Sequence, residues 1–369
     1  MKYDYLIVGC GLYGSTFAQQ ATENGYKCLI IDKRNHIGGN CYTEKKEDID
    51  IHKYGPHIFH TNSDKIWDYV NRFSKFNNFI NRPKVCYNDR IYSFPINLMT
   101  LYHLWGVKTP QEALSKLESV RIHNETPENL EEWILSQVGE EIYKTFIYGY
   151  TKKQWGTEPK NLPSFIIKRL PIRLNFDDNY YFDKYQGVPI DGYTNMITNM
   201  IDGIEHILDA DYFSNRSYYD GLAKTVVYTG PIDKFFDYTF DKLEYRTLSF
   251  ETLRLDTQDY QGNAIINFTS DKVPYTRIVE HKHFNMSHSG NIPHTYITKE
   301  FSAKWSDQSD PYYPINNEQN NFRYSQYKHL SQTTSKDKYI FGGRLAEYKY
   351  YDMHQIIGSA LKMFADTQL

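Results

Sequence analysis

The sequence predicts an α/β fold with three parts: a parallel-sheet domain at the N-terminus, an inserted helical domain and an antiparallel-sheet domain. Three observations lead to this prediction. Residues 3–32 read as strand, glycine turn, helix and strand. Residues 97–150 have helical periodicity and are too many for a loop. Short apolar runs alternate with turns over residues 225–296, as in an antiparallel sheet.

The N-terminal stretch carries the pattern of a dinucleotide-binding turn. The apolar strand Tyr3–Val8 runs into Gly9, Gly11 and Gly14, a helix follows, and a second apolar strand ends at Asp32. Gly9 permits the tight turn, Gly11 a close approach of the backbone to a pyrophosphate, and Gly14 close packing of helix on strand. The unpaired N–H groups at the helix start would bind phosphate, and Asp32 would accept hydrogen bonds from ribose hydroxyls. This order of elements predicts a Rossmann-like domain.

The residues after Asp32 indicate which dinucleotide is bound. The pair Gly38–Gly39 would give a second close backbone approach to a long cofactor. Such a pair resembles the extended fingerprint of FAD proteins of the glutathione-reductase and amine-oxidase type. A simple hairpin turn would also explain it, so FAD is favoured over NAD while NAD stays open. Lys33, Gly39 and Asn40 are expected to contact the cofactor.

Length, charge and cysteine usage narrow the class of protein. A chain of 369 residues is too long for one compact core, so two or three domains are expected. The net charge of −3 argues against nucleic acid or an anionic membrane as partner. No apolar run approaches the ~20 residues that span a bilayer, and no signal-peptide pattern precedes the first strand, so we expect a cytoplasmic protein. Reduced thiols without metal-ligand spacing are expected at Cys10, Cys28, Cys41 and Cys86.

Two histidines stand three residues apart in the stretch Tyr54–Thr61, after a Gly-Pro pair. His57 and His60 could be metal ligands, acid–base groups or core residues. No third His, Cys or acid at ligand spacing lies nearby, so no metal site is predicted.

The remaining elements follow from caps and periodicity. Thr126 is expected to cap a helix that has Pro127 in its first turn, and Gly139 to end that helix. The other predicted elements are helices at Ile66–Phe73, Glu140–Tyr150 and after Asp352, a hairpin at Val85–Ser93, and strands at Val226–Pro231 and Tyr339–Arg344.

These elements give a division into three discontinuous parts. The predicted ranges are 1–75, 195–235 and 325–369 for the FAD-binding domain, 95–175 for the inserted helical domain with a mobile loop near 157–172, and 76–94, 176–194 and 236–324 for the antiparallel-sheet domain.

Several stretches taken together resemble one family. They are Gly55–Thr61, Gly149–Gly156, Lys168–Pro171, Val273–Arg277, Tyr312–Pro314, Gly343–Arg344 and Tyr350–Met353. Over nearly its whole length the chain resembles the bacterial UDP-galactopyranose mutases.

That resemblance implies an isomerase that interconverts UDP-galactopyranose and UDP-galactofuranose without net redox change, for galactofuranose biosynthesis and cell-surface polysaccharide. It implies that FAD must be reduced, by reduced nicotinamide or another reductant. Flavin N5 would attack the anomeric carbon and expel UDP, and the sugar would open and reclose through a different hydroxyl. A homodimer is expected.

The resemblance also assigns site residues. Arg169 and Arg277 would hold the diphosphate, where an Arg fork suits the developing charge. His57 and His60 would lie by the isoalloxazine. The expected substrate-binding residues are Asn81, Phe146, Tyr150, Thr151, Trp155, Tyr180, Asn267, Tyr312 and Tyr350, with core packing as the alternative for Phe146. The expected flavin-binding residues near the C-terminus are Gly343, Arg344, Asp352 and Met353.

Three alternatives remain open at this stage. An amine-oxidase-like redox flavoenzyme could share the fold, and it would turn over with oxygen. A non-catalytic UDP-sugar-binding protein would bind UDP without converting it. A mutase could also accept or prefer the 2-acetamido sugar nucleotide, since one pocket side chain could decide that.

Overall fold

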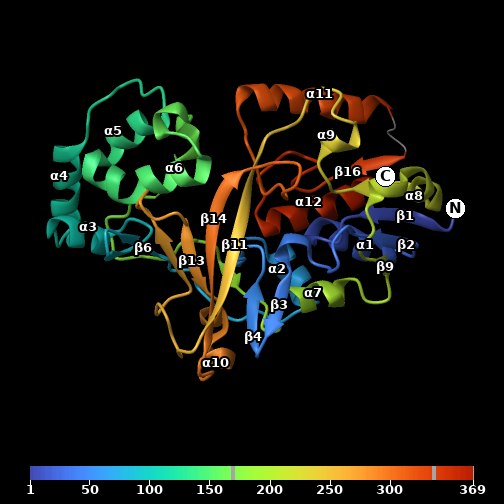
Figure 1. Ribbon diagram of the computed structural model, residues 1–369, viewed down its shortest axis with the longest axis horizontal. Coiled ribbons are helices and arrows are strands. Elements are labelled where there is room, and N and C mark those ends of the chain that lie inside the picture. The colour runs from blue at the N-terminus through green and yellow to red at the C-terminus, as the bar shows by residue number, and fades with distance from the viewer. Residues whose placement is uncertain (168–170, 335–337, 369) are drawn as a thin grey trace. The chain divides into compact units, whose positions relative to one another are not determined.

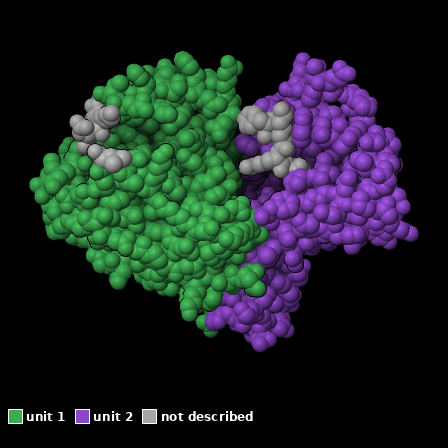
Figure 2. All heavy atoms as spheres, turned by 180° about the vertical axis from the view of Figure 1, so that it is seen from behind, with its two compact units in different colours: residues 1–78, 183–246, 305–369 green, residues 79–182, 247–304 purple. Residues whose placement is uncertain are grey.

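The computed structural model describes residues 1–167, 171–334 and 338–368. It divides into two compact units, coloured separately in Figure 2. Unit 1 consists of Met1–Asn78, Asp183–Arg246 and Trp305–Leu369, and unit 2 of Phe79–Phe182 and Thr247–Lys304. The helical segment and most of the antiparallel sheet therefore belong to the same unit, while the three-part division stays a prediction.

Unit 1 is built on a five-stranded parallel sheet, which confirms the predicted Rossmann-like fold (Figure 1). Helices cover it, so its central strands are apolar runs, and all four residues of the strand Cys28–Ile31 are buried. In the order in which they pair, the strands are β16 (Tyr339–Phe341), β10 (Ala223–Tyr228), β1 (Tyr3–Val8), β2 (Cys28–Ile31) and β9 (Glu205–Ile207).

The helix α1 (Leu12–Glu23) packs against α12 (Met353–Asp366) through aromatic rings. The ring centroids of Phe17 and Phe364 lie 5.6 Å apart, edge to face. The other elements of unit 1 are β3 (Thr43–Lys46), β4 (Ile49–His52), β5 (Phe59–Thr61), α2 (Asp64–Asn71), β8 (Tyr185–Gly187), α7 (Gly192–Met200), α8 (Arg216–Leu222), α9 (Ile232–Phe235), β15 (Tyr313–Pro314) and α11 (Glu318–Thr334).

Unit 2 contains most of a mixed sheet, in which a parallel pair occurs among antiparallel pairs. The parallel pair joins β12 to β6. The edge strand of the sheet is β15 of unit 1, and the strand paired with it begins in unit 1 and continues into unit 2. In pairing order these strands are β11 (Tyr245–Leu255), β14 (Thr295–Lys304), β13 (Arg277–Glu280), β12 (Ile265–Phe268), β6 (Lys84–Tyr87) and β7 (Arg90–Ser93).

The helical part of unit 2 confirms the predicted helical block and corrects one helix start. The side chain of Asn129 accepts a hydrogen bond from the N–H of Glu132 at 3.0 Å, and the Asn129 amide donates to that Glu at 2.8 Å. This pair caps the helix better than Thr126, so the helix begins at Leu130. The helices are α3 (Leu98–Trp105), α4 (Pro110–Val120), α5 (Leu130–Ile142), a π-helical stretch (Tyr143–Tyr148) and α6 (Gly149–Trp155).

The backbone leaves helical geometry at Gly139, where the helix was predicted to end. The φ of Gly139 is +74°, although this residue lies within the helix α5 (Leu130–Ile142). A Cβ there would lie 2.4 Å from the carbonyl oxygen of Val120, so the close approach of α4 requires glycine.

Buried His281 predicts a loss of stability in acid. Burial lowers the pKa of His281 to about 3, below the ordinary value of 6.5. The unfolded chain therefore binds a proton below pH 6.5 that the folded chain does not, and the free energy of unfolding should fall by up to about 1.4 kcal/mol per pH unit. Urea titrations at pH 7 and pH 5 would measure this. The variant His281→Gln should weaken the pH dependence of the free energy of unfolding, whereas His288→Gln, at an exposed position, should leave it unchanged. An equal pH dependence in the two variants would contradict this prediction.

Candidate functional site

Two glycine turns of unit 1 lie against each other. A Cβ on Gly14 would lie 2.0 Å from the carbonyl oxygen of Gly9, so α1 can pack on β1 only with glycine there. Gly9 has a φ of +111°, and a Cβ on it would lie 2.1 Å from Oγ1 of Thr229. A Cβ on Gly39 would lie 3.0 Å from Cα of Gly11. The glycines of the two turns thus form a cradle, which fits the backbone approach that a dinucleotide needs.

The start of α1 is suited to an anion. Its N-cap is Gly11, which has no side chain to occupy the free N–H groups, and no acid lies in the first turn. Asp32 supports this turn, because its Oδ2 accepts from the N–H of Cys10 at 2.7 Å and its Oδ1 from the N–H of Arg34 at 2.9 Å. The predicted ribose contact would be an additional role of the same carboxylate.

Lys33 and Asn40 take part in a small polar network beside the cradle. Lys33 forms an ion pair with Asp310 at 2.8 Å, and the Nη2 of Arg34 contacts Asp310 at 2.7 Å. The same guanidinium donates to Oδ1 of Asn40 at 3.0 Å. These contacts hold the segment after Asp32, so a cofactor contact by Lys33 or Asn40 stays a prediction.

The amino end of α12 reaches the second glycine turn. The Sγ of Cys41 lies 3.8 Å from the Sδ of Met353, so Met353 is beside the turn that holds Gly39. Arg344 donates to the carbonyl of Tyr351 at 2.6 Å, and its guanidinium lies 5.1 Å from the ring centre of Tyr350. The Nε of Arg344 is buried without a hydrogen-bond partner among the described residues, as expected of a group that faces a ligand or water.

The two predicted histidines have separate partners. The N–H of His57 donates to Nδ1 of His52 at 3.0 Å, and Nδ1 of His57 lies 2.8 Å from the carbonyl oxygen of Gly55. His60 forms a hydrogen bond through Nδ1 with Asp183, and its ring packs edge-on against His354 at 5.0 Å. His57 therefore fits a structural role, and His60 fits acid–base chemistry better.

In unit 2, a buried carboxylate orients Arg277. Arg277 and Asn267 are opposite each other in the antiparallel pair β12–β13. Nε and Nη2 of Arg277 donate to Oε2 of Glu300, at 2.9 and 2.6 Å. The Glu300 side chain is only 2% exposed and that of Arg277 is 21% exposed, so the guanidinium is fixed from its buried side. This arrangement would hold a cation in place for a phosphate.

Lys153 links α6 to the β12–β13 hairpin, which carries Asn267 and Arg277. Its Nζ donates to the carbonyl oxygens of Phe268, Ser270, Val273 and Tyr275 at distances of 2.6 to 3.0 Å. Burial lowers the pKa of Lys153 to about 8, while the negative charge of Asp271 opposes that shift. The predicted nucleotide residues Tyr150, Thr151 and Trp155 all lie on this anchored helix.

The other predicted substrate residues are spread over both units. The Phe146 ring is buried in the helical core, edge-on to Tyr92 at 5.4 Å, which favours the core alternative. The N–H of Tyr180 donates to the carbonyl of Asn81 at 2.8 Å, so these two lie together in unit 2. Tyr312 is buried in unit 1. Arg169 lies outside the described residues.

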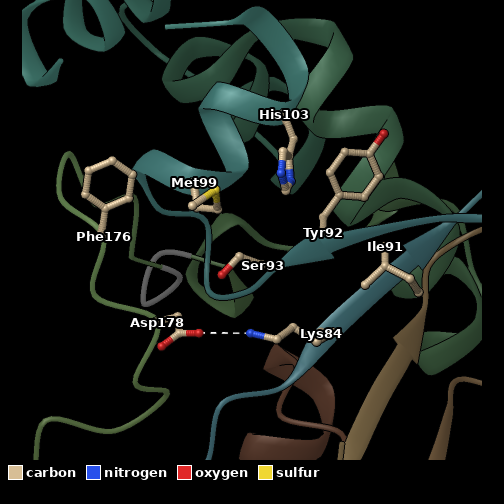
Figure 3. A pocket seen from close by; sticks show the side chains of 8 residues that line it. All are labelled: Lys84, Ile91, Tyr92, Ser93, Met99, His103, Phe176 and Asp178. Atoms are coloured by element: carbon tan, nitrogen blue, oxygen red, sulfur yellow. Dashed lines mark hydrogen bonds and ion pairs between the residues drawn. The ribbon is translucent and has the colours of Figure 1, made fainter. Parts of the chain in front are cut away.

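A cavity of about 490 Å³ in unit 2 is not the predicted site (Figure 3). An ion pair between Lys84 and Asp178, 2.9 Å apart, closes one side of it. None of the predicted substrate residues lines it; the lining residues are Lys84, Ile91, Tyr92, Ser93, Met99, His103, Phe176 and Asp178.

Comparison with known proteins identifies the family. The family described as UDP-galactopyranose mutase (GLF) matches residues 145–350, and an NAD(P)-binding Rossmann-like domain matches residues 7–73. A probable UDP-galactopyranose mutase of Klebsiella pneumoniae is 41% identical over 365 residues, covering 97% of this chain and 92% of the relative. The chain belongs to the UDP-galactopyranose mutase family.

Other relatives extend this picture. A dTDP-fucopyranose mutase of Escherichia coli is 40% identical over 368 residues, and the match covers 97% of this chain and 96% of that relative. The crystal structure of a reduced UDP-galactopyranose mutase has a TM-score of 0.75 at 14% identity, over 99% of this chain and 95% of that one. A putrescine oxidase has a TM-score of 0.59 at 10% identity, over 100% and 99% of the two chains. These two structures show the shared fold.

For a member of the mutase family, the structure adds residues that the sequence reading missed. Asp183, Glu300 and His354 contact predicted site residues, and Lys153 anchors a predicted site helix. Lys153 stood within the quoted stretch Gly149–Gly156, and that was the only sequence signal for it. The sequence held no signal for Asp183, Glu300 or His354, because the residues that they contact lie in distant parts of the chain.

Two trios of side chains bring possible metal-binding atoms within 4.8 Å of one another: His60, Asp352 and His354, and Asp259, Glu280 and His283. Hydrogen bonds and ion pairs with neighbouring protein groups engage His60 in the first trio and all three side chains of the second, so no ligand role is assigned to them. Within the described ranges, no helix has the length and apolar character needed to cross a bilayer.

Proposed function

We propose that this chain interconverts the pyranose and furanose forms of UDP-galactose with reduced FAD as cofactor. The observation that carries the proposal is the match to mutases along almost the whole chain. The cradle between the two glycine turns fits a dinucleotide, and the amino end of α12 lies beside it.

Reduced flavin would supply the nucleophile that keeps hold of the sugar while the ring changes size. The chain's own residues would then bind and orient the nucleotide. Arg277, held by Glu300, would stabilise the charge that develops on the departing phosphate, and Arg169 would act with it. Asn267 and the aromatic side chains of α6 would hold the nucleoside. Tyr350 would reach phosphate or sugar oxygens, and Arg344 would face the flavin.

A second candidate function is the same ring contraction on a dTDP-linked sugar. The dTDP-fucopyranose mutase matches this chain about as well as the UDP-galactopyranose mutase does, 40% against 41% identity. The two substrates differ in the base, in the nucleotide 2′-hydroxyl and in the sugar 6-hydroxyl, so one side chain at each position could decide between them.

One experiment distinguishes these candidates. Dithionite-reduced holoprotein is incubated with UDP-galactopyranose, its 2-acetamido analogue or dTDP-fucopyranose, and the products are separated by chromatography. We expect conversion of UDP-galactose only when the flavin is reduced. Faster conversion of another sugar nucleotide would reassign the substrate. Oxygen consumption coupled to substrate oxidation would indicate a redox enzyme, and UDP binding without conversion a binding protein.

The cofactor and assembly are proposed on the same basis. Purified protein should be yellow and release FAD on denaturation; colourless protein that takes up no FAD would contradict the proposal. We propose reduced nicotinamide as a reductant, a homodimer in solution and a cytoplasmic location. Flavin bleaching by NADH or NADPH under nitrogen would test the proposed reductant, and light scattering would test the proposed homodimer.

A further inference from the structure

A cluster of four titratable side chains meets at the amino end of α12, all within unit 1. His60 lies on β5, and β5 pairs with β8, which begins two residues after Asp183. His354 lies in the first turn of α12, which packs against β5. Atoms of His60, His354 and Asp352 come within 4.8 Å of one another. Met353, between two of them, touches the second glycine turn, so the cluster borders the proposed flavin site.

The Asp183 carboxylate is fixed on both oxygens. Its Oδ2 bonds Nδ1 of His60, and its Oδ1 accepts from the side-chain amide of Asn62. Asn62 is held in turn by the N–H of Lys184, at 2.9 Å. A carboxylate only accepts hydrogen bonds, so the proton of neutral His60 resides on Nδ1. Nε2 is then the nitrogen that takes up and gives back a proton.

His354 supplies a second ring beside the first. Burial, and then the nearby charge of His60, lower the pKa of His354. Its Nδ1 is buried and has no hydrogen-bond partner in the described part of the chain. On the neighbouring helix α2, Asp64 forms an ion pair with Lys184 at 2.7 Å.

We propose that Asp183 is a positioning residue that holds His60 so that Nε2 of the imidazolium form donates its proton to the sugar ring oxygen on opening and recovers one on closure. This rests on the proposed function. Opening breaks the bond between the anomeric carbon and the ring oxygen; the electron pair stays on oxygen, which takes the proton from Nε2. Closure forms a bond to the 4-hydroxyl oxygen, whose proton returns to Nε2. No proton is gained or lost over the cycle.

The test compares Asp183→Asn with Asp64→Asn, a matched change in an exposed ion pair of the same region. Selective ¹⁵N labelling of histidine, with His60→Gln for assignment, reports the tautomer without any turnover. We expect wild-type and Asp64→Asn proteins to carry the neutral proton of His60 on Nδ1, and Asp183→Asn to shift it toward Nε2. In reduced holoprotein, Asp183→Asn should lower kcat about 10²-fold with little change in KM, and Asp64→Asn should leave both unchanged.

Two further variants, Asp183→Glu and His354→Gln, test the same proposal independently of Asp183→Asn. Asp183→Glu should restore part of the lost kcat, because the carboxylate returns. His354→Gln should shift the pH dependence of kcat, because it removes the neighbouring titratable ring, whereas a purely structural role for the cluster predicts no such shift. An unchanged tautomer in Asp183→Asn, or wild-type kcat across the pH range, would overturn the proposal. If wild-type protein converts no sugar nucleotide, the proposed function falls, and the tautomer measurement still decides whether Asp183 positions His60.

Discussion

Replacing Arg277 by alanine should lower kcat by about 10²–10³-fold, the usual loss when one group that stabilises developing charge is removed. The guanidinium is fixed by Glu300 from its buried side, so it would reach the departing phosphate without reorganising. KM should rise less than kcat falls, because the charge on the leaving nucleotide is largest in the transition state. Steady-state rates with dithionite-reduced enzyme measure both constants.

Stability must be separated from catalysis in that variant, because Arg277→Ala leaves the Glu300 carboxylate buried without its cation. Breaking such a buried pair typically costs about 3–5 kcal/mol. The double variant Arg277→Ala/Glu300→Gln should recover much of the lost Tm and none of the lost rate. Arg82→Ala, which removes a half-exposed guanidinium from the same unit, should keep wild-type kcat. If the double variant turned over at the wild-type rate, Arg277 would have no role in catalysis.

Replacing Gly14 by alanine should abolish FAD retention and lower Tm. The new methyl group would lie 2.0 Å from the carbonyl oxygen of Gly9 and 2.9 Å from Cγ2 of Ile7, so α1 must move off β1. That movement displaces the N–H groups that we expect to hold the cofactor phosphates. The ratio of flavin absorbance to protein after gel filtration measures the loss.

Gly221→Ala is the matched control, because no atom lies within 4 Å of a Cβ at that position in α8. It should keep the wild-type flavin content and gain slightly in stability, as Gly to Ala does inside a helix. A Gly14→Ala protein that purifies with a full complement of FAD would show that the β1–α1 turn does not bind the cofactor.

The sequence predicted the parts of the fold whose signal is local. The turn from β1 through Gly14 and the helix after Asp352 were both readable, because apolar periodicity, glycine spacing and caps lie within a few residues of one another. The helix start at Thr126 was wrong for a related reason. Asn129 and Glu132 form a competing cap only three residues further on, and propensity alone does not rank two adequate caps.

The predicted site was incomplete where its residues are joined by strand pairing. His60 and Asp183 are 123 residues apart and meet because β5 lies beside β8. Arg277 and Glu300 are 23 residues apart and meet across β13 and β14. A register between strands depends on the whole sheet, so no local pattern around either acid could have indicated its partner.

The four carbonyl groups gathered on Lys153 have a mechanical consequence. A single ammonium group binds the loop after β12 at both of its ends, so that loop cannot slide along α6 without giving up several strong hydrogen bonds together. The backbone of α6 and the backbone of the loop after β12 should therefore move together. Any adjustment to a bulkier base would have to come from rotation of side chains, with the backbone of both segments left in place.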